Sequence, residues 1–168
     1  MPQEIAVVGL VSDTHGLLRP EVLEALRGVD LIVHAGDVGA PAILDALKAV
    51  APVVAVRGNI DRGDWASALP LTAIVEPASL AMYVIHDLAR LNLERGAASF
   101  QVVVSGHSHK PAQSERSGVL FINPGSAGPR RFHLPVSVAR LNLRHTPLDV
   151  EFIDLLGGLA RFQPLPPR

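Results

Sequence analysis

The stretch Leu31-Ile32-Val33-His34-Ala35-Gly36-Asp37 decides the fold class of this chain. Its apolar residues follow one another without alternation and end at a glycine, which is typical of a strand buried on both faces of an α/β sheet. A carboxylate follows at once. An Asp in this place either caps the next helix or holds a cation in the crevice at the carboxyl ends of the strands. The neighbouring segments help to decide between these two uses.

The first third of the chain repeats a strand–helix order. Strands are predicted at residues 5–12, 31–35 and 53–56, and helices at residues 20–26 and 42–50, where apolar residues recur at helical spacing. Pro20 suits the first turn of its helix. This βαβαβ order predicts a mostly parallel sheet with right-handed crossovers and with helices on its faces.

The rest of the chain is less regular. Short strands are predicted at residues 74–76, 80–85, 101–105 and 119–122, late antiparallel strands at 137–143 and 150–153, and a helix at 88–98. The first two of these strands suit a hairpin. Residues 163–168 are expected to form a frayed tail. Because no repeat or linker divides the sequence, we expect a single domain over residues 1–168.

Composition limits the partners and the kinds of metal site. Lys and Arg number 15 and Asp and Glu 16, so a formal charge of -1 gives no overall field for nucleic acid or an anionic membrane. The sequence has no cysteine, so a metal would need His, Asp, Glu or Asn. We expect neither a signal peptide nor a membrane span, and we expect a cytoplasmic protein. A homo-oligomer is not predicted.

Metal-capable side chains follow five of the predicted strands. They are Asp13, His15, Asp37, Asn59, His86, His107 and His109. Because parallel strands of one sheet present their carboxyl ends at one edge, we expect these side chains to converge. In the pairs Asp13/His15 and His107/His109 the spacing of two would put both side chains on the same side of an extended backbone. Glycines precede Asp37, Asn59 and His107, as expected where backbone packs closely against a ligand.

Each of these pieces alone also fits a structural role. Asp13-Thr14-His15-Gly16 fits a capped turn, His86 a hydrogen-bonded core histidine, and Asn59 a turn residue after glycine. Only their joint occurrence at successive strand ends favours a metal site. Seven nitrogen and oxygen ligands are too many for one tetrahedral zinc ion, but they suit two ions that share a bridging ligand. Two such cations would leave an excess of positive charge, which suits a phosphate ester.

The ordered motifs resemble one known family. Asp13-x-His15, Gly36-Asp37, Gly58-Asn59-x-Asp61, His86 and Gly106-His107-Ser108-His109 together resemble the calcineurin-like metallophosphoesterases. The chain length, the motif Asn123-Pro124-Gly125-Ser126 and the lack of inserted caps resemble the small single-domain bacterial and archaeal phosphodiesterases of that family. The resemblance runs from about Ile5 to Leu143. It implies a four-layer α/β/β/α sandwich with mixed sheets and helices on the outer faces.

The resemblance also implies a dinuclear metal site and a reaction. One ion would be held by Asp13, His15, Asp37 and His109, and the other by Asp37, Asn59, His86 and His107, with Asp37 as the bridge. Hydrolysis would proceed by attack of a metal-bridging hydroxide on a small phosphate ester, with Asp37, Asn59 and His86 acting through the metals. Mn²⁺ is the expected metal, with Ni²⁺, Fe²⁺ or Zn²⁺ as alternatives. A phosphomonoesterase and a non-catalytic protein-binding scaffold, similar to the retromer subunit of the same fold, stay open.

Two positions depart from the family pattern. Many members carry a leaving-group histidine where this chain has Ile60, and a Gly-His pair where His86 is followed by Asp87. Isoleucine cannot donate a proton, so we expect weak activity on esters with poor leaving groups. The second departure puts the contacts to the phosphate in doubt more than the metal ligands.

Several other polar residues have expected roles. Asp61 is expected to hold the Asn59 turn or to orient a nearby ligand. Arg130 and Arg131 either line the crevice, where they would pair with phosphate oxygens, or are an ordinary solvated pair. His34 is expected to be packed or hydrogen-bonded. His133 and His145 lie outside every motif and are expected at the surface.

Overall fold

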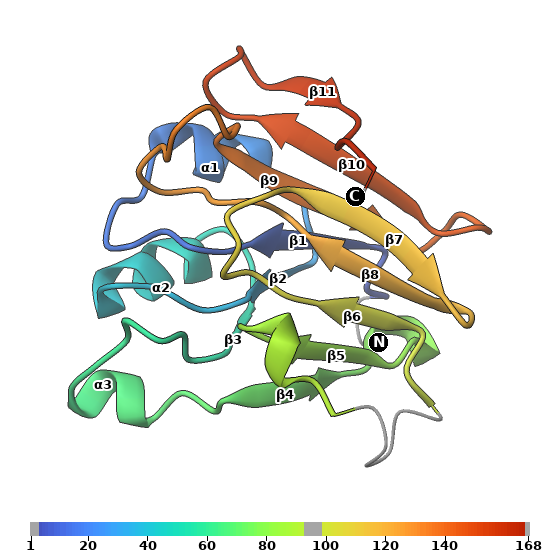
Figure 1. Ribbon diagram of the computed structural model, residues 1–168, viewed down its shortest axis with the longest axis horizontal. Helices are drawn as coiled ribbons and strands as arrows, with labels where there is room; N and C mark the ends of the chain where they lie inside the picture. The colour runs from blue at the N-terminus through green and yellow to red at the C-terminus, as the bar shows by residue number, and fades with distance from the viewer. Residues whose placement is uncertain (1–3, 93–98, 167–168) are drawn as a thin grey trace.

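The computed structural model describes residues 4–92 and 99–166 and contains two stacked β-sheets (Figure 1). The first sheet has the strand order β11-β10-β9-β1-β2-β3. The parallel part consists of β1 (Val7–Val11), β2 (Leu31–His34) and β3 (Val53–Ala55). The antiparallel part, which pairs with β1, consists of β9 (Ser137–Asn142), β10 (Asp149–Asp154) and β11 (Ala160–Phe162). The sheet is therefore mixed, whereas the βαβαβ order alone predicted a mostly parallel one.

The second sheet has the strand order β4-β5-β6-β8-β7. Its strands are β4 (Thr72–Val75), β5 (Met82–Ile85), β6 (Val102–Val104), β7 (Ala112–Arg116) and β8 (Val119–Asn123). The inner strands β5, β6 and β8 are parallel, and the edge strands β4 and β7 are antiparallel to their neighbours. The expected hairpin of residues 74–85 is the β4–β5 pair.

Short helices connect the strands. They are α1 (Pro20–Ala25), α2 (Pro41–Lys48) and α3 (Asp64–Ser67), together with the 3₁₀ turns η1 (Pro77–Ser79) and η2 (Leu88–Arg90). A proline begins both α1 and α2, where its missing N–H costs no helical hydrogen bond. In Figure 1 α1, α2 and α3 lie along the left of the view. In the described part of the chain, the helices are too short or too polar to span a membrane.

Apolar clusters hold four layers together. Ile32 of β2 packs with α1 and α2, while Leu31 and Val33 pack against the second sheet, so β2 is buried on both faces as predicted. The outer face of the second sheet carries a smaller cluster around Val103 and Phe121, covered by Leu88 of η2. The expected α/β sandwich is confirmed, and in the described residues its fourth layer is thin.

Three short elements were not predicted. The strand β7 has the polar sequence Ala112-Gln113-Ser114-Glu115-Arg116 and lies at a sheet edge, so no apolar alternation marks it. The strand β11 is another short edge strand, and α3 is a single turn. Of the helix predicted at residues 88–98, the described part is the turn η2, and residues 93–98 lie outside the described residues.

Candidate metal centre

The seven predicted ligands all follow parallel strands, but these strands belong to both sheets. Those of the first sheet are Asp13 and His15 after β1, Asp37 after β2 and Asn59 after β3, and those of the second are His86 after β5 and His107 and His109 after β6. The carboxyl ends of the two sheets meet because the sheets pack face to face. The side chains therefore converge across the sandwich, whereas a single sheet edge was expected.

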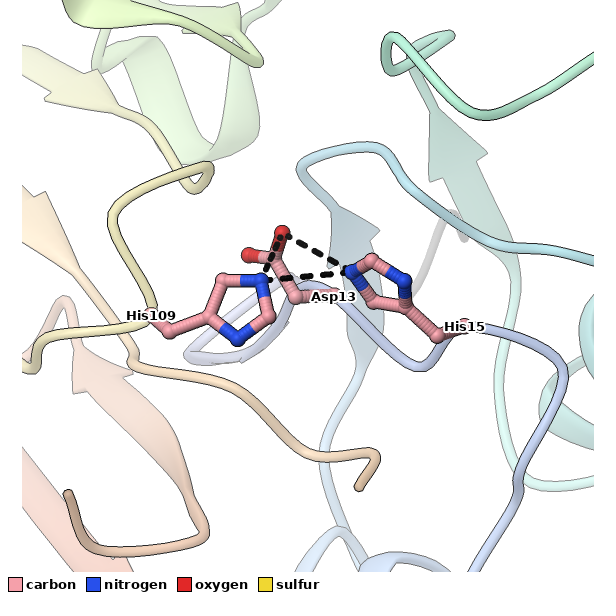
Figure 2. Close-up of side chains that lie close together, drawn as sticks. All are labelled: Asp13, His15 and His109. Carbon is pink, nitrogen blue, oxygen red and sulfur yellow. Dashed lines mark hydrogen bonds and ion pairs between the residues drawn. The ribbon is translucent and has the colours of Figure 1, made fainter. Parts of the chain in front are cut away.

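Asp13, His15 and His109 form one half of the centre, and Figure 2 shows them turned toward one another. Oδ1 of Asp13 lies 3.3 Å from Nε2 of His109 and 3.7 Å from Nε2 of His15. The two imidazole nitrogens lie 3.2 Å apart. Asp13 and His109 are buried and His15 is partly buried, so we call this set the buried half.

Asp37 connects this half to the second one. Its Oδ2 lies 3.4 Å from Nε2 of His15 and 3.4 Å from Nε2 of His86. Its other oxygen, Oδ1, accepts a hydrogen bond from the amide of Ile60 at 3.0 Å. One oxygen is thus held by the backbone, and the other lies between histidines of the two halves.

Asn59, His86 and His107 form the second half. Oδ1 of Asn59 lies 3.0 Å from Nε2 of His86 and 3.1 Å from Nδ1 of His107. Nδ1 of His86 donates to the carbonyl oxygen of Ala35 at 2.7 Å, which directs the lone pair of Nε2 toward Asn59 and Asp37 when the ring is neutral. His86 is buried, but Asn59 and His107 are exposed, so we call this set the open half.

The backbone at the centre has an unusual conformation. Five of the seven residues, namely Asp13, His15, Asp37, His107 and His109, have positive φ angles between 49° and 69°. Such a conformation costs a non-glycine residue about 1–3 kcal/mol and is common at functional sites. The extended backbone assumed for the pairs Asp13/His15 and His107/His109 is therefore wrong. Left-handed turns direct these side chains into the centre.

Glycines allow the turns to approach one another. A Cβ atom on Gly58 would collide with the amide and the carboxylate of Asp37, and one on Gly36 would lie 2.7 Å from Nδ1 of His86. A Cβ on Gly106 would collide with Ser12. The glycines that precede predicted ligands are thus required by close packing, as the sequence indicated.

The buried half has an unsatisfied carboxylate oxygen that suits a cation. Oδ1 of Asp13 and Nδ1 of His109 are buried and have no hydrogen-bond partner in residues 4–92 and 99–166. A buried carboxylate oxygen without a partner is costly, and a cation held between it and the two neighbouring imidazoles would satisfy it. Imidazole nitrogens with carboxylate and amide oxygens are the ligands that Mn²⁺, Fe²⁺, Zn²⁺ and Ni²⁺ accept. The residues present therefore fit divalent metal ions.

The charges of the centre favour cation binding as well. Burial alone would raise the pKa of Asp13, but the close contacts of its Oδ1 with His109 and His15 and the hydrogen bond from Ser12 outweigh burial and hold that pKa well below its usual value. Burial would also raise the pKa of Asp37, but the contact with His86 at 3.4 Å and the hydrogen bond from the Ile60 amide outweigh burial and lower this pKa. Both carboxylates are therefore ionised at neutral pH. The same contact with Asp37 outweighs the effect of burial on His86 and raises its pKa.

Asp61 supports the loop that carries Asp37. Its Oδ1 accepts from the amide of Gly39 at 2.8 Å, and its Oδ2 accepts from the amides of Gly58 at 2.8 Å and Val38 at 3.2 Å. One buried carboxylate thus connects the turn after β2 to the turn after β3. This arrangement positions Asp37 relative to Asn59 without placing Asp61 among the ligands.

The structure adds supporting residues that the sequence analysis did not assign. Ser12 Oγ donates to Oδ2 of Asp13 at 2.7 Å, and Ser126 Oγ donates to the Asp13 carbonyl at 3.0 Å. Nδ2 of Asn123 donates to the Gly106 carbonyl at 2.9 Å and to Ser108 Oγ at 3.0 Å. The motif Asn123-Pro124-Gly125-Ser126 had entered only as part of a resemblance. Its position at the carboxyl end of β8, a strand parallel to β6, was the signal for a role at the centre.

His34 lies beneath the buried half and is fully buried. Its Nδ1 accepts from the amide of Gly36 at 3.2 Å, so the proton is on Nε2, which donates to Thr14 Oγ1 at 2.9 Å. Thr14 Oγ1 in turn donates to the Val38 carbonyl at 2.8 Å. Burial lowers the pKa of His34 to about 4, so the ring is neutral. His34 is thus hydrogen-bonded, as the sequence analysis expected.

The remaining expected residues lie at the surface. Arg130, Arg131, His133 and His145 are exposed. The loop that carries the two arginines begins beside the centre, because the Gly128 backbone packs against the carbonyls of Asp13 and Thr14. A role of Arg130 at the substrate rim stays a prediction.

Comparison with known proteins agrees with this geometry. Residues 7–146 match the family model described as a calcineurin-like phosphoesterase superfamily domain. A probable metallophosphoesterase from Methanothermobacter thermautotrophicus is 38% identical over 92% of this chain and 96% of its own. A phosphodiesterase from Methanocaldococcus jannaschii is 28% identical over 70% of this chain and 82% of its own. The solved structure of the phosphoesterase YfcE from E. coli superposes with a TM-score of 0.72 and 26% identity over 95% of this chain and 98% of that one.

Proposed function

The chain belongs to the calcineurin-like phosphoesterase superfamily, and we propose that it is a metal-dependent phosphodiesterase with a dinuclear centre. The observation that supports this proposal most directly is the position of Asp37. Its Oδ2 lies 3.4 Å from a histidine nitrogen of the buried half and 3.4 Å from one of the open half. A carboxylate oxygen between two sets of ligands is what a bridge between two ions requires.

The two halves would each hold one ion. Asp13, His15 and His109 with Asp37 would hold the first, and Asn59, His86 and His107 with Asp37 the second. Divalent ions, when bound, supply a hydroxide nucleophile near neutral pH and positive charge that neutralises the phosphoryl oxygens. We propose Mn²⁺ as the first metal to test.

Residues around the centre preorganise the predicted ligands. The Ile60 amide and the carboxylate of Asp61 fix the loop of Asp37, and Ser12 fixes one oxygen of Asp13. The lowered pKa values of Asp13 and Asp37 keep both groups anionic and able to bind cations at neutral pH. Such preorganised ligands and charges need little rearrangement when a phosphate ester binds.

Two features favour a diester over a monoester. The M. jannaschii relative is named a phosphodiesterase, and Ile60 presents an apolar side chain, 38% exposed, beside Asp37. A diester has a second organic group and one negative charge fewer than a monoester dianion, so an apolar rim suits it better. Without a proton donor at Ile60, good leaving groups should react fastest.

The decisive experiment compares two substrates and one substitution. Purified protein with Mn²⁺ should hydrolyse bis-p-nitrophenyl phosphate faster than p-nitrophenyl phosphate. Asp37→Asn should lower the diester rate by roughly a thousandfold or more, because the bridge loses its charge. Asp149→Asn, which changes an exposed carboxylate on β10, is the matched control and should keep the full rate.

The same experiment separates the alternatives. A faster monoester reaction would assign a phosphomonoesterase. Folded protein that shows no turnover with Mn²⁺, Ni²⁺, Fe²⁺ or Zn²⁺, and that retains none of these metals, would contradict an enzymatic role and favour a non-catalytic scaffold.

A further inference from the structure

A groove of about 950 Å³ opens directly onto the open half of the centre. Asn59, His86 and His107 line one end of it, and the outer face of β4 and β5 forms its floor. Its volume lies near the upper end of the range for small-molecule pockets. The groove therefore has room for much more than a phosphate group.

The pairing of β4 with β5 explains the floor. Ile74 lies opposite Tyr83 and Thr72 lies opposite Ile85, so these four side chains share one face of the hairpin. Ile74 is 60% exposed, although it lies on a strand. An apolar side chain left open inside a hollow, and not on a convex surface, suits a bound apolar group.

Aromatic rings stand at the side of this floor. Tyr83 and Phe100 have ring centroids 5.1 Å apart with an angle of 43° between their planes, and both line the groove. The polar residues Gln101 and Ser99 also line the groove. Aromatic faces bordered by hydrogen-bonding groups suit a flat heteroaromatic ring better than they suit an acyl chain, which would gain nothing from the polar edge.

The groove also contains a positively charged residue, Arg57. The side chain of Arg57 lines the groove and is partly buried, and in residues 4–92 and 99–166 its guanidinium makes no hydrogen bond or ion pair. Arg57 precedes Asn59 by two residues. A guanidinium that has no ion pair in the described residues and lines the same groove as Asn59, His86 and His107 is suited to an anionic oxygen of a substrate.

We propose that this groove binds the organic group of the substrate and selects small phosphodiesters of nucleosides. The phosphate would lie at Asn59, His86 and His107 beside Arg57, and the base would lie against Tyr83 and Phe100. This inference rests on the proposed function and extends it by naming a substrate class. It also assigns Tyr83 and Phe100 as the residues that determine specificity.

Two substrates with the same leaving group test the proposal. Thymidine 5′-(p-nitrophenyl phosphate) and methyl p-nitrophenyl phosphate release the same p-nitrophenolate, so the ratio of their kcat/KM values reports binding of the other group. We expect the wild-type protein to favour the thymidine ester by roughly tenfold or more, as stacking of one base permits. A ratio near one would overturn the proposal even if both esters were hydrolysed.

Matched variants locate the effect. Tyr83→Leu and Phe100→Leu keep an apolar side chain but remove the ring, and each should lower the ratio severalfold because the thymidine ester loses its stacking partner. Tyr83→Phe keeps the ring and should keep the ratio. Phe132→Leu removes an aromatic ring that is 89% exposed and does not line the groove, and it should have no effect. Equal ratios in all of these variants would contradict the assignment.

A binding measurement keeps this inference separate from the proposed function. Calorimetric titration of the Mn²⁺-loaded protein with thymidine 5′-monophosphate should show binding that Tyr83→Leu weakens about as much as it lowers the kinetic ratio. If no ester is hydrolysed but this binding is present and depends on the ring, the nucleoside groove stands and the phosphodiesterase proposal fails. If esters are hydrolysed but no ring-dependent binding is found, the phosphodiesterase proposal stands and the nucleoside groove fails.

Discussion

The two halves of the centre have similar ligands but opposite exposure. Asp13 is fully buried and His109 is 4% exposed, whereas Asn59 and His107 are exposed at the end of a groove. Charge interactions are stronger where water is excluded, so the buried half should hold its ion more firmly. The open half can exchange water for substrate. The difference suggests that one half is built for retention of a metal and the other for access of the substrate.

The hydrogen bonds that hold the two halves in place also differ. Oδ2 of Asp13 accepts hydrogen bonds from Ser12 Oγ and from the amide of His107, so the buried half is held by contacts from both sheets. Asn59 instead lies in a turn that Asp61 fixes from one side. Substitutions that act on one half and leave the other intact can therefore test the comparison.

Among the substitutions that act on one half alone, loss of its histidine should have the largest effect. His109→Ala should abolish binding of the first ion and lower diester hydrolysis by roughly a hundredfold or more, with no rescue at raised Mn²⁺ concentration. His107→Ala should weaken binding of the second ion, and excess Mn²⁺ should restore part of the rate. Metal content after dialysis and rates over a Mn²⁺ titration measure both effects.

His145→Ala, on the exposed loop after β9, is the control for these two variants. Equal metal loss and equal rescue for His109→Ala and His107→Ala would show that exposure does not distinguish the halves.

The pH dependence of stability should report the hydrogen bonds beneath the buried half. His34 has a pKa of about 4 in the folded chain, against an ordinary value of 6.5. Between these pH values His34 is protonated in the unfolded chain and neutral in the folded one. The contribution of His34 to the free energy of unfolding is therefore fully present above pH 6.5 and is lost as the pH falls toward 4. The loss should be about 3 kcal/mol in the free energy of unfolding.

Urea denaturation between pH 7.5 and pH 4 measures this effect as a difference between the wild-type protein and His34→Gln, which does not titrate. The comparison is needed because His86, with its raised pKa, contributes in the opposite direction. The control is His133→Gln at the surface. A wild-type-minus-variant difference that does not change with pH would rule out a buried neutral His34.

Asp61→Asn should destabilise the protein by a smaller amount. An amide offers one acceptor oxygen where the carboxylate serves the backbone N–H groups of Val38, Gly39 and Gly58, so at least one buried donor loses its partner. We expect a loss of about 2 kcal/mol in the free energy of unfolding. The open half should also bind Mn²⁺ more weakly, because its turn is released. Urea denaturation and a Mn²⁺ titration measure the two effects, with Asp149→Asn as the control, and an unchanged Mn²⁺ affinity would contradict the positioning role.

Ile60→His should have the smallest effect, and in the favourable direction. The side chain is 38% exposed, so an imidazole fits without repacking, and it could protonate a poor leaving group near the open half. We expect a gain of about tenfold on diesters with aliphatic leaving groups, below the full value for a well-oriented acid. Ile60→Gln, which is polar but cannot transfer a proton, should give no gain. An equal gain in both variants would exclude proton transfer as the cause.

Much of the centre could be predicted because its signals are local. A run such as Leu31–Ala35 indicates a buried strand by itself, and each of the seven predicted ligands lies in the loop after a strand. Glycines before Asp37, Asn59 and His107 mark close backbone approach wherever they occur. Edge strands such as β7 and β11 carry no comparable signal, because none of their residues is buried and no apolar alternation results.

The sequence by itself determined the type and order of the predicted ligands, the α/β class and the family, because strand periodicity and side-chain chemistry are properties of short segments. The tertiary structure decided that the ligands come from two sheets, that left-handed turns direct them inward, and that one half is buried while the other opens onto a groove. These features depend on the packing of β1–β3 against β5, β6 and β8. Contacts between residues as far apart as Asp13 and His109 arise only from that packing.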